Sequence, residues 1–314
     1  MNHRVKATLQ NGVWGLLFAL GFQSSAQKPE AASARPDRVV LGVLENHMGE
    51  YSGEPDFRAV RAVFEKEGSD WRSFPTKTNT YHDLDTLPHS YPKEMTWTIA
   101  FDGKNLGMIT AKTPAQFKFY SETGFELITS KGPVPTVGRK SREFGGFTGE
   151  PVYRPLVAVS KPNFSDPDHW KPAKLSPELI SAARAQFRIK FPNVLNCRNP
   201  DENVQRSWKY QDEDIHVTEA HSSNNGWSLI ELNLTGNKCD AMDYGTGFIG
   251  QWYMIDPSGK PRFLASDMWL VDAGDYDSSG RSEVLFAVDG YNMGGYRLFY
   301  RDFTKSAEFL FSYH

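Results

Sequence analysis

Short runs in which apolar and polar residues alternate, separated by turn residues, recur along most of the chain. This pattern is typical of antiparallel β-hairpins, because successive side chains of a strand point to opposite faces. Asx-Gly and Pro-Ser-Gly tips supply the tight turns that hairpins need. The sequence therefore predicts a mainly β protein, with hairpins over 60–74, 97–110, 117–129, 215–234, 248–264 and 283–303 and a short strand over 156–160.

One segment follows a helical period instead. Ser176 is a good helix N-cap, and Leu179, Ala183 and Phe187 recur at intervals of four, which places them on one face of a helix. The sequence predicts one α-helix over 177–190.

The hairpin turns suggest two architectures. Several turn centres are spaced by roughly 33 to 36 residues, a period expected of repeated β units. We therefore expect a single β-rich domain over 39–314, built as a small or irregular β-propeller, with a two-sheet β-sandwich as the alternative. The segments 39–44 and 309–313 are expected to share a sheet, because such pairing would close a ring and protect the apolar edge of the last strand.

The N-terminal segment has the features of a secretory signal. A short basic stretch precedes an apolar run over 12–22, and Ser24 and Ala26 suit cleavage before Gln27. The apolar run is shorter than the roughly 20 residues that span a bilayer. Residues 1–26 are thus predicted to be a cleaved signal peptide and 27–38 a flexible lead. The mature protein should be secreted or periplasmic, with no remaining transmembrane segment.

Net charge and cysteine content indicate which partners and which covalent cross-links to expect. Removing 1–26 takes away Arg4 and Lys6, which changes the formal net charge from −3 to −5 and disfavours nucleic acid as a partner. The chain has two cysteines, Cys197 and Cys239. In an exported chain such a pair favours a disulfide, worth about 4 kcal/mol on the chain-entropy model. Two buried free thiols are the alternative.

The segment over 271–286, VDAGDYDSSGRSEVLF, contains the most informative pattern. Ca²⁺ needs several oxygen ligands, and alternate residues of a tight loop that bends at a glycine can supply them. The predicted ligands are Asp275, Asp277, Ser279, the main-chain carbonyl of Arg281, and Glu283. An Asx-rich turn that stabilises its own backbone without metal is the alternative.

This loop resembles the calcium loop of FG-GAP repeats, also called VCBS or integrin-α-type repeats, over 272–288. In those repeats the loop links propeller strands, so the resemblance implies both a structural Ca²⁺ ion and a propeller. From the hairpin VFEKEGSDWRSF (63–74) to the terminal FLFSYH (309–314), the chain resembles a family of uncharacterised exported bacterial proteins. That second resemblance implies no particular activity.

Two further motifs carry less chemistry. The glycines of GTGFIG (245–250) match a dinucleotide fingerprint by letters, but they lead into a strand and not into a helix. In HVTEAH, regular alternation would place His216 on the face opposite to Glu219 and His221. The two histidines then cannot bind one ion, and we expect a hydrogen-bonded or solvent-facing pair instead.

The leading functional hypothesis is a non-catalytic binding or adhesion-type module with a structural calcium loop. Its partner would be an extracytoplasmic protein or a glycan. A secreted or periplasmic hydrolase is one alternative, and a carbohydrate-binding module with an exposed row of tryptophans is the other. The hydrolase would need an active site built from residues such as Glu45, His47, His82, Asp83, His169 and Asp243.

Overall fold

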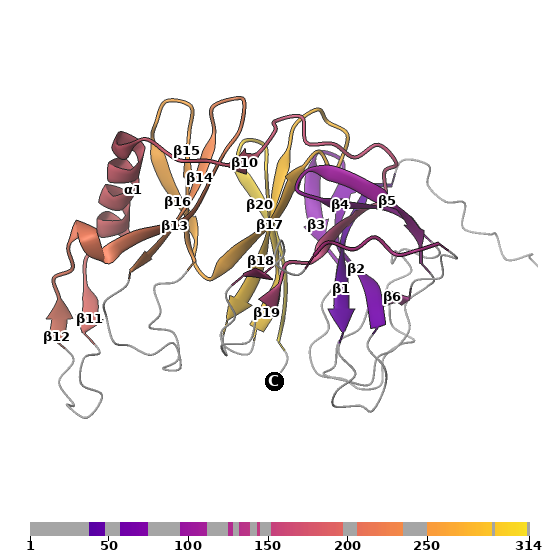
Figure 1. Ribbon diagram of the computed structural model, residues 1–314, viewed down its shortest axis with the longest axis horizontal. Helices are drawn as coiled ribbons and strands as arrows, with labels where there is room; N and C mark the ends of the chain where they lie inside the picture. The colour runs from indigo at the N-terminus through magenta and orange to yellow at the C-terminus, as the bar shows by residue number, and fades with distance from the viewer. Residues whose placement is uncertain are drawn as a thin grey trace, which may run out of the picture. The chain divides into compact units, whose positions relative to one another are not determined.

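The computed structural model describes residues 38–47, 57–74, 95–111, 125–127, 132–138, 143–144, 152–196, 206–234, 250–290 and 293–312. These residues form a mainly β structure of antiparallel sheets with one α-helix, as the sequence pattern predicts (Figure 1). They contain three larger sheets, none of which closes on itself, and two two-stranded ribbons.

The seven-stranded sheet is built from the N-terminal half of the chain. Its order is β3-β2-β1-β9-β4-β5, and β6 also pairs with β2. Strand β9 comes late in the sequence but inserts between β1 and β4, with which it pairs antiparallel. The strands are β1 (Val40–His47), β2 (Phe57–Glu67), β3 (Asp70–Ser73), β4 (Thr96–Phe101), β5 (Lys104–Thr110), β6 (Phe125–Leu127) and β9 (Leu156–Val159).

The other two large sheets are mostly simple meanders. The five-stranded sheet has the order β10-β13-β14-β15-β16, and the four-stranded sheet has the order β17-β18-β19-β20. Their strands are β10 (Lys171–Pro172), β13 (Ile215–Ser222), β14 (Ser228–Leu234), β15 (Gln251–Ile255), β16 (Pro261–Ala265), β17 (Met268–Gly274), β18 (Glu283–Gly290), β19 (Met293–Tyr300) and β20 (Lys305–Ser312).

The helix α1 (Pro177–Lys190) has the predicted bounds. The Ser176 side chain accepts a hydrogen bond from the Leu179 N–H, and Ala183 and Phe187 are buried. Short ribbons and one 3-10 turn complete the described elements: β7 (Glu143–Phe144) with β8 (Val152–Tyr153), β11 (Val194–Asn196) with β12 (Arg206–Trp208), and η3 (Asp212–Asp214).

Three hydrophobic cores hold these elements together, and the four-stranded sheet contributes to two of them. Leu285, Leu298 and Phe309 belong to the core shared with the seven-stranded sheet. Phe286 and Phe299 belong to the core shared with the five-stranded sheet. The opposite face of the five-stranded sheet packs on α1 in the third core, as Figure 1 shows. The four-stranded sheet is therefore the middle layer of this arrangement.

The expected ring closure is wrong. Strand β1 lies in the seven-stranded sheet, whereas β20 pairs with β19 in the four-stranded sheet. The apolar face of β20 is buried by face-to-face packing, with Ala307 and Phe309 in the first core, so no pairing with the first strand is needed to cover it.

Five of the expected hairpins are confirmed as β2–β3, β4–β5, β13–β14, β15–β16 and β18–β19. Most of the 117–129 hairpin lies outside the described residues.

Candidate metal centre

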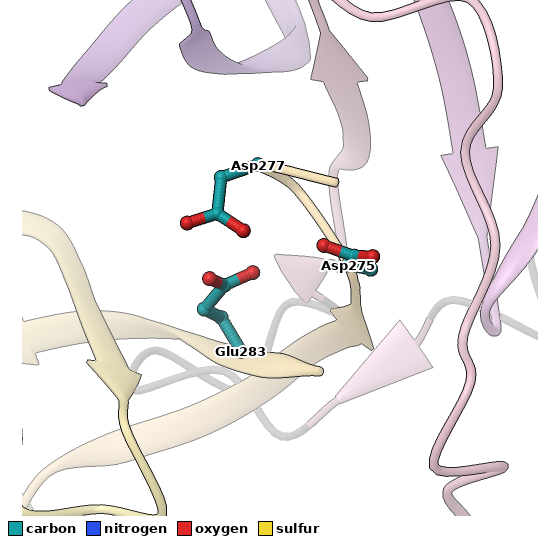
Figure 2. Close-up of side chains that lie close together, drawn as sticks. All are labelled: Asp275, Asp277 and Glu283. Carbon is teal, nitrogen blue, oxygen red and sulfur yellow. The ribbon is translucent and has the colours of Figure 1, made fainter. Parts of the chain in front are cut away.

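Three carboxylates converge where β17 gives way to β18. Asp275 and Asp277 lie in the connecting loop, and Glu283 is the first residue of β18. One oxygen from each lies within 4.8 Å of the other two. Figure 2 shows the carboxylates of Asp277 and Glu283 facing each other, with Asp275 beside them.

The loop backbone folds around its own carboxylates. The two oxygens of Asp275 accept hydrogen bonds from the N–H groups of Ser279 (2.8 Å) and Gly280 (2.7 Å). Asp277 Oδ1 also accepts a bond from the Ser279 N–H, at 3.0 Å. Gly280 has a φ of 80°, a conformation that glycine adopts without the strain other residues meet. These bonds are those of an Asx-rich turn, and each carboxylate oxygen keeps a second lone pair for a cation.

The structure does not bring all five predicted ligand residues together in one cluster. Asp275, Asp277 and Glu283 come together, and Ser279 faces the aspartates through its backbone N–H. Arg281 is exposed, and its guanidinium pairs with Asp302 at 3.3 Å.

A second loop, over 165–168, is hydrogen-bonded to the loop that connects β17 to β18. The Asp275 N–H donates to the carbonyl of Ser165 (2.9 Å), and the Ser282 N–H donates to the Asp168 carboxylate (3.0 Å). The Ser282 hydroxyl donates to Asp166. The position of the loop is thus set by residues more than a hundred positions earlier in the chain.

Glu283 is the most deeply buried member, with an exposed fraction of 4%. Its Oε2 accepts a bond from the Tyr276 N–H at 2.9 Å, and its Oε1 accepts one from Trp71 Nε1 at 3.4 Å. Burial, together with the negative charge of Asp277, raises the pKa of Glu283 to about 8. Without a bound cation, Glu283 therefore holds its proton at neutral pH.

Lys66 from β2 reaches the cluster from the seven-stranded sheet. Its ammonium pairs with Asp277 Oδ2 and lies 5.1 Å from the Trp71 ring centroid and 5.8 Å from that of Tyr300. Burial alone would raise the pKa of Asp277, but the bond and charge of Lys66 and the bonds from Ser279 together outweigh it, so the pKa is lowered. Burial raises the pKa of Asp275. The sequence does not predict that Lys66, Trp71 and Tyr300 lie at this site, because no local signal connects them to the loop.

The residues considered for a hydrolase site do not form one in the described part of the chain. Glu45 accepts hydrogen bonds from Arg61 (3.0 Å) and from the Tyr296 hydroxyl (2.6 Å). His169 is exposed, with a φ of 52°. The other four candidates lie outside the described residues: the His47 side chain, His82, Asp83 and Asp243. The same holds for both cysteines, Cys197 and Cys239.

The expected orientation of HVTEAH is wrong. Strand β13 carries a bulge between Val217 and Glu219, so His216 pairs with Asn233, Glu219 with Glu231, and His221 with Leu229. Directly paired residues of antiparallel strands share a face, which places His216 on the same face as Glu219 and His221. The extra residue of the bulge cancels the alternation that a regular strand would have. His221 is hydrogen-bonded, with its Nε2 2.6 Å from Glu219 Oε1, and His216 is exposed.

The tryptophans with described side chains form no exposed row. All of them are buried or half-buried: Trp71, Trp97, Trp170, Trp227, Trp252 and Trp269.

Comparisons with protein-family models, with curated proteins and with solved structures gave no match. Among the described residues, no helix has the length and apolar character needed to cross a bilayer. The site is therefore interpreted from its own chemistry.

Proposed function

We propose that this protein is an exported, non-catalytic binding module of the adhesion type whose C-terminal loop is stabilised by a Ca²⁺ ion. Its partner is an extracytoplasmic protein or a glycan, in line with the signal-like N-terminus and the acidic net charge. The observation that carries the proposal is the convergence of Asp275, Asp277 and Glu283 within 4.8 Å.

The chemistry of the cluster suits a hard divalent cation. Carboxylate oxygens are the ligands Ca²⁺ prefers, and three carboxylates repel one another unless positive charge sits between them. Lys66 and the Glu283 proton supply part of that charge in the metal-free protein. A bound Ca²⁺ ion would replace the proton. The loop and the first residue of β18 already contact both strands of the β2–β3 hairpin, Asp277 through Lys66 and Glu283 through Trp71.

The two consecutive meanders support the FG-GAP-like interpretation of the fold. The strands β13 to β16 and β17 to β20 each form a four-stranded antiparallel run in chain order, which is how a propeller blade is built. The candidate calcium loop links the first two strands of the second meander. We propose that these two meanders are blade-like units.

A calcium titration of the melting temperature tests the proposal. With a dissociation constant on the order of 10⁻⁴ to 10⁻³ M, Ca²⁺ at ten times that constant adds about 1.4 kcal/mol of stability. The wild type should melt at a higher temperature in millimolar Ca²⁺ than in chelator. Asp275→Ala and Asp277→Ala should abolish that difference.

Asp256→Ala is the matched control. Asp256 Oδ1 holds the β15–β16 turn by accepting bonds from the N–H groups of Ser258 (2.9 Å) and Lys260 (3.0 Å), without a second carboxylate. This variant loses an Asx turn of the same kind and should keep the full calcium response. If neither Ca²⁺ nor chelator moves the melting curve of the wild type, the loop is only a turn.

Export is tested separately by intact mass. Protein recovered from the periplasm or medium should begin at Gln27. A full-length mass at that location would contradict the predicted cleavage.

A further inference from the structure

The bulge in β13 places two glutamates opposite each other on one face of the sheet. Glu219 and Glu231 are directly paired across β13 and β14. Side chains of such pairs lie close together, and like charges there are destabilising. At least one of the two groups must therefore lose its charge or find a counter-ion.

His221 accounts for only one of them. Its Nε2 lies 2.6 Å from Glu219 Oε1, so the imidazole is hydrogen-bonded to that carboxylate. Glu231 is hydrogen-bonded by the side chains of Thr218, the extra residue of the bulge, and Asn233. No ion pair of Glu231 is found in the described part of the chain.

The surroundings of Glu231 are apolar on the side of the core. Glu231 is 7% exposed, and its cross-strand partner on β15 is Trp252, which is fully buried between the five- and four-stranded sheets. Leu229, two residues earlier on the same face, belongs to the same core. Ionised Glu231 would therefore place a charge at the edge of this hydrophobic layer.

The basic groups of the elements around the pair are engaged elsewhere or exposed. Arg262 on β16 donates to the carbonyl of Phe303, and Arg297 on β19 pairs with Glu308 at 2.6 Å. Lys171 on β10 is exposed and lies opposite Ser222. Glu219 is the charged group whose field acts on Glu231, and it favours the protonated form.

We propose that the bulge of β13 and the facing segment of β14 form a proton-binding site, in which Glu231 binds and releases a carboxyl proton around neutral pH beside the hydrogen-bonded pair of Glu219 and His221. The five-stranded sheet is then a pH-responsive element whose packing on the four-stranded sheet is tightest when Glu231 is neutral. This site is separate from the candidate metal centre and does not depend on a bound cation.

The direction of the response follows from burial. Burial, together with the charge of Glu219, raises the pKa of Glu231 from its ordinary value of 4.5 to about 7. A folded-state pKa above the unfolded one means that the folded protein binds the proton more tightly. The stabilisation is therefore complete below about pH 4.5 and is lost as the pH rises through about 7.

Carboxyl ¹³C NMR of the full chain, labelled at glutamate Cδ, measures this proton directly. One resonance should titrate with a midpoint near pH 7 and should vanish in Glu231→Gln. In Glu219→Gln the midpoint of that resonance should fall by about one pH unit, because the facing charge is gone. Coupling between the groups makes the midpoint a property of the cluster, so the shift between variants is the decisive quantity.

Glu283→Gln is the matched control, because Glu283 is the other buried glutamate with a raised pKa. It should remove a different resonance and leave the Glu231 midpoint unchanged. A wild-type midpoint for Glu231 near 4.5, or a midpoint that Glu219→Gln does not lower, would overturn the proposal. If Glu231→Gln fails to fold, the comparison of wild type with Glu219→Gln still decides.

Discussion

Replacing Lys66 by methionine should tighten calcium binding while weakening the metal-free protein. The ammonium of Lys66 pairs with the same Asp277 carboxylate that is proposed to bind the cation. Methionine keeps an unbranched apolar stem against Trp71 and Tyr300 but removes the charge. The substitution therefore separates the two cations that compete for one carboxylate.

The size of the effect follows from Coulomb's law. Two cations that contact one carboxylate lie about 4 Å apart, and a single and a double charge at that distance repel by about 2 kcal/mol even at the dielectric constant of water. This corresponds to about a thirtyfold lower dissociation constant for Ca²⁺. In chelator the sign reverses, because the Asp277 side chain is only 7% exposed and loses its partner. Removing one partner of such a pair costs on the order of 3 kcal/mol.

Calorimetric titration with Ca²⁺ at low salt compares wild type, Lys66→Met and Lys305→Met. Lys305 pairs with Asp70 at 2.5 Å, so its replacement makes the same change in net charge without touching the triad. The dissociation constant should fall about thirtyfold in Lys66→Met, and it should stay close to the wild-type value in Lys305→Met. Equal constants for the two variants would refute the competition, and absence of binding in all three proteins would refute the calcium site itself.

Two other substitutions test the packing next to the candidate metal centre and the protonation of Glu283. Gly274→Ala should destabilise the protein by about 2 kcal/mol in urea unfolding, because its Cβ would lie 2.2 Å from Phe164 Cζ; unchanged stability would mean that the ring moves aside at no cost. Glu283→Gln should flatten the pH dependence of melting in chelator. The pKa of Glu283 is raised to about 8, so the stability that its proton provides is complete below about pH 4.5 and is lost as the pH rises through 8. Parallel melting profiles of variant and wild type would contradict this.

Features that depend on neighbouring residues were predictable from the sequence. The helix over 177–190 follows from a cap and a period of four, and the hairpins follow from alternation around turn residues. The grouping of Asp275, Asp277 and Glu283 is local in the same sense, because they lie within nine residues of one another in a single loop. Short-range geometry leaves few ways to arrange such segments.

Features that depend on distant contacts were not predictable. Lys66 and Asp277 are 211 positions apart, and nothing in either segment indicates the other. The order of the seven-stranded sheet, with β9 between β1 and β4, depends on which faces the remaining chain covers. The bulge at Thr218 is a single extra residue, yet it moves His216 to the face of Glu219 and His221. Its sequence context is that of a regular strand.

The position of the four-stranded sheet, late in the sequence and between two cores, affects the order in which the chain can fold. This sheet follows the other two large sheets in the sequence, yet it supplies one side of both intersheet cores. Until residues 268–312 emerge, the seven- and five-stranded sheets each expose an apolar face that has nothing to pack on. Such nascent surfaces are prone to aggregate, and contacts this distant in sequence form slowly. The two intersheet cores can thus form only once these residues are available, and loss of β17 to β20 would leave each earlier sheet without its intersheet core.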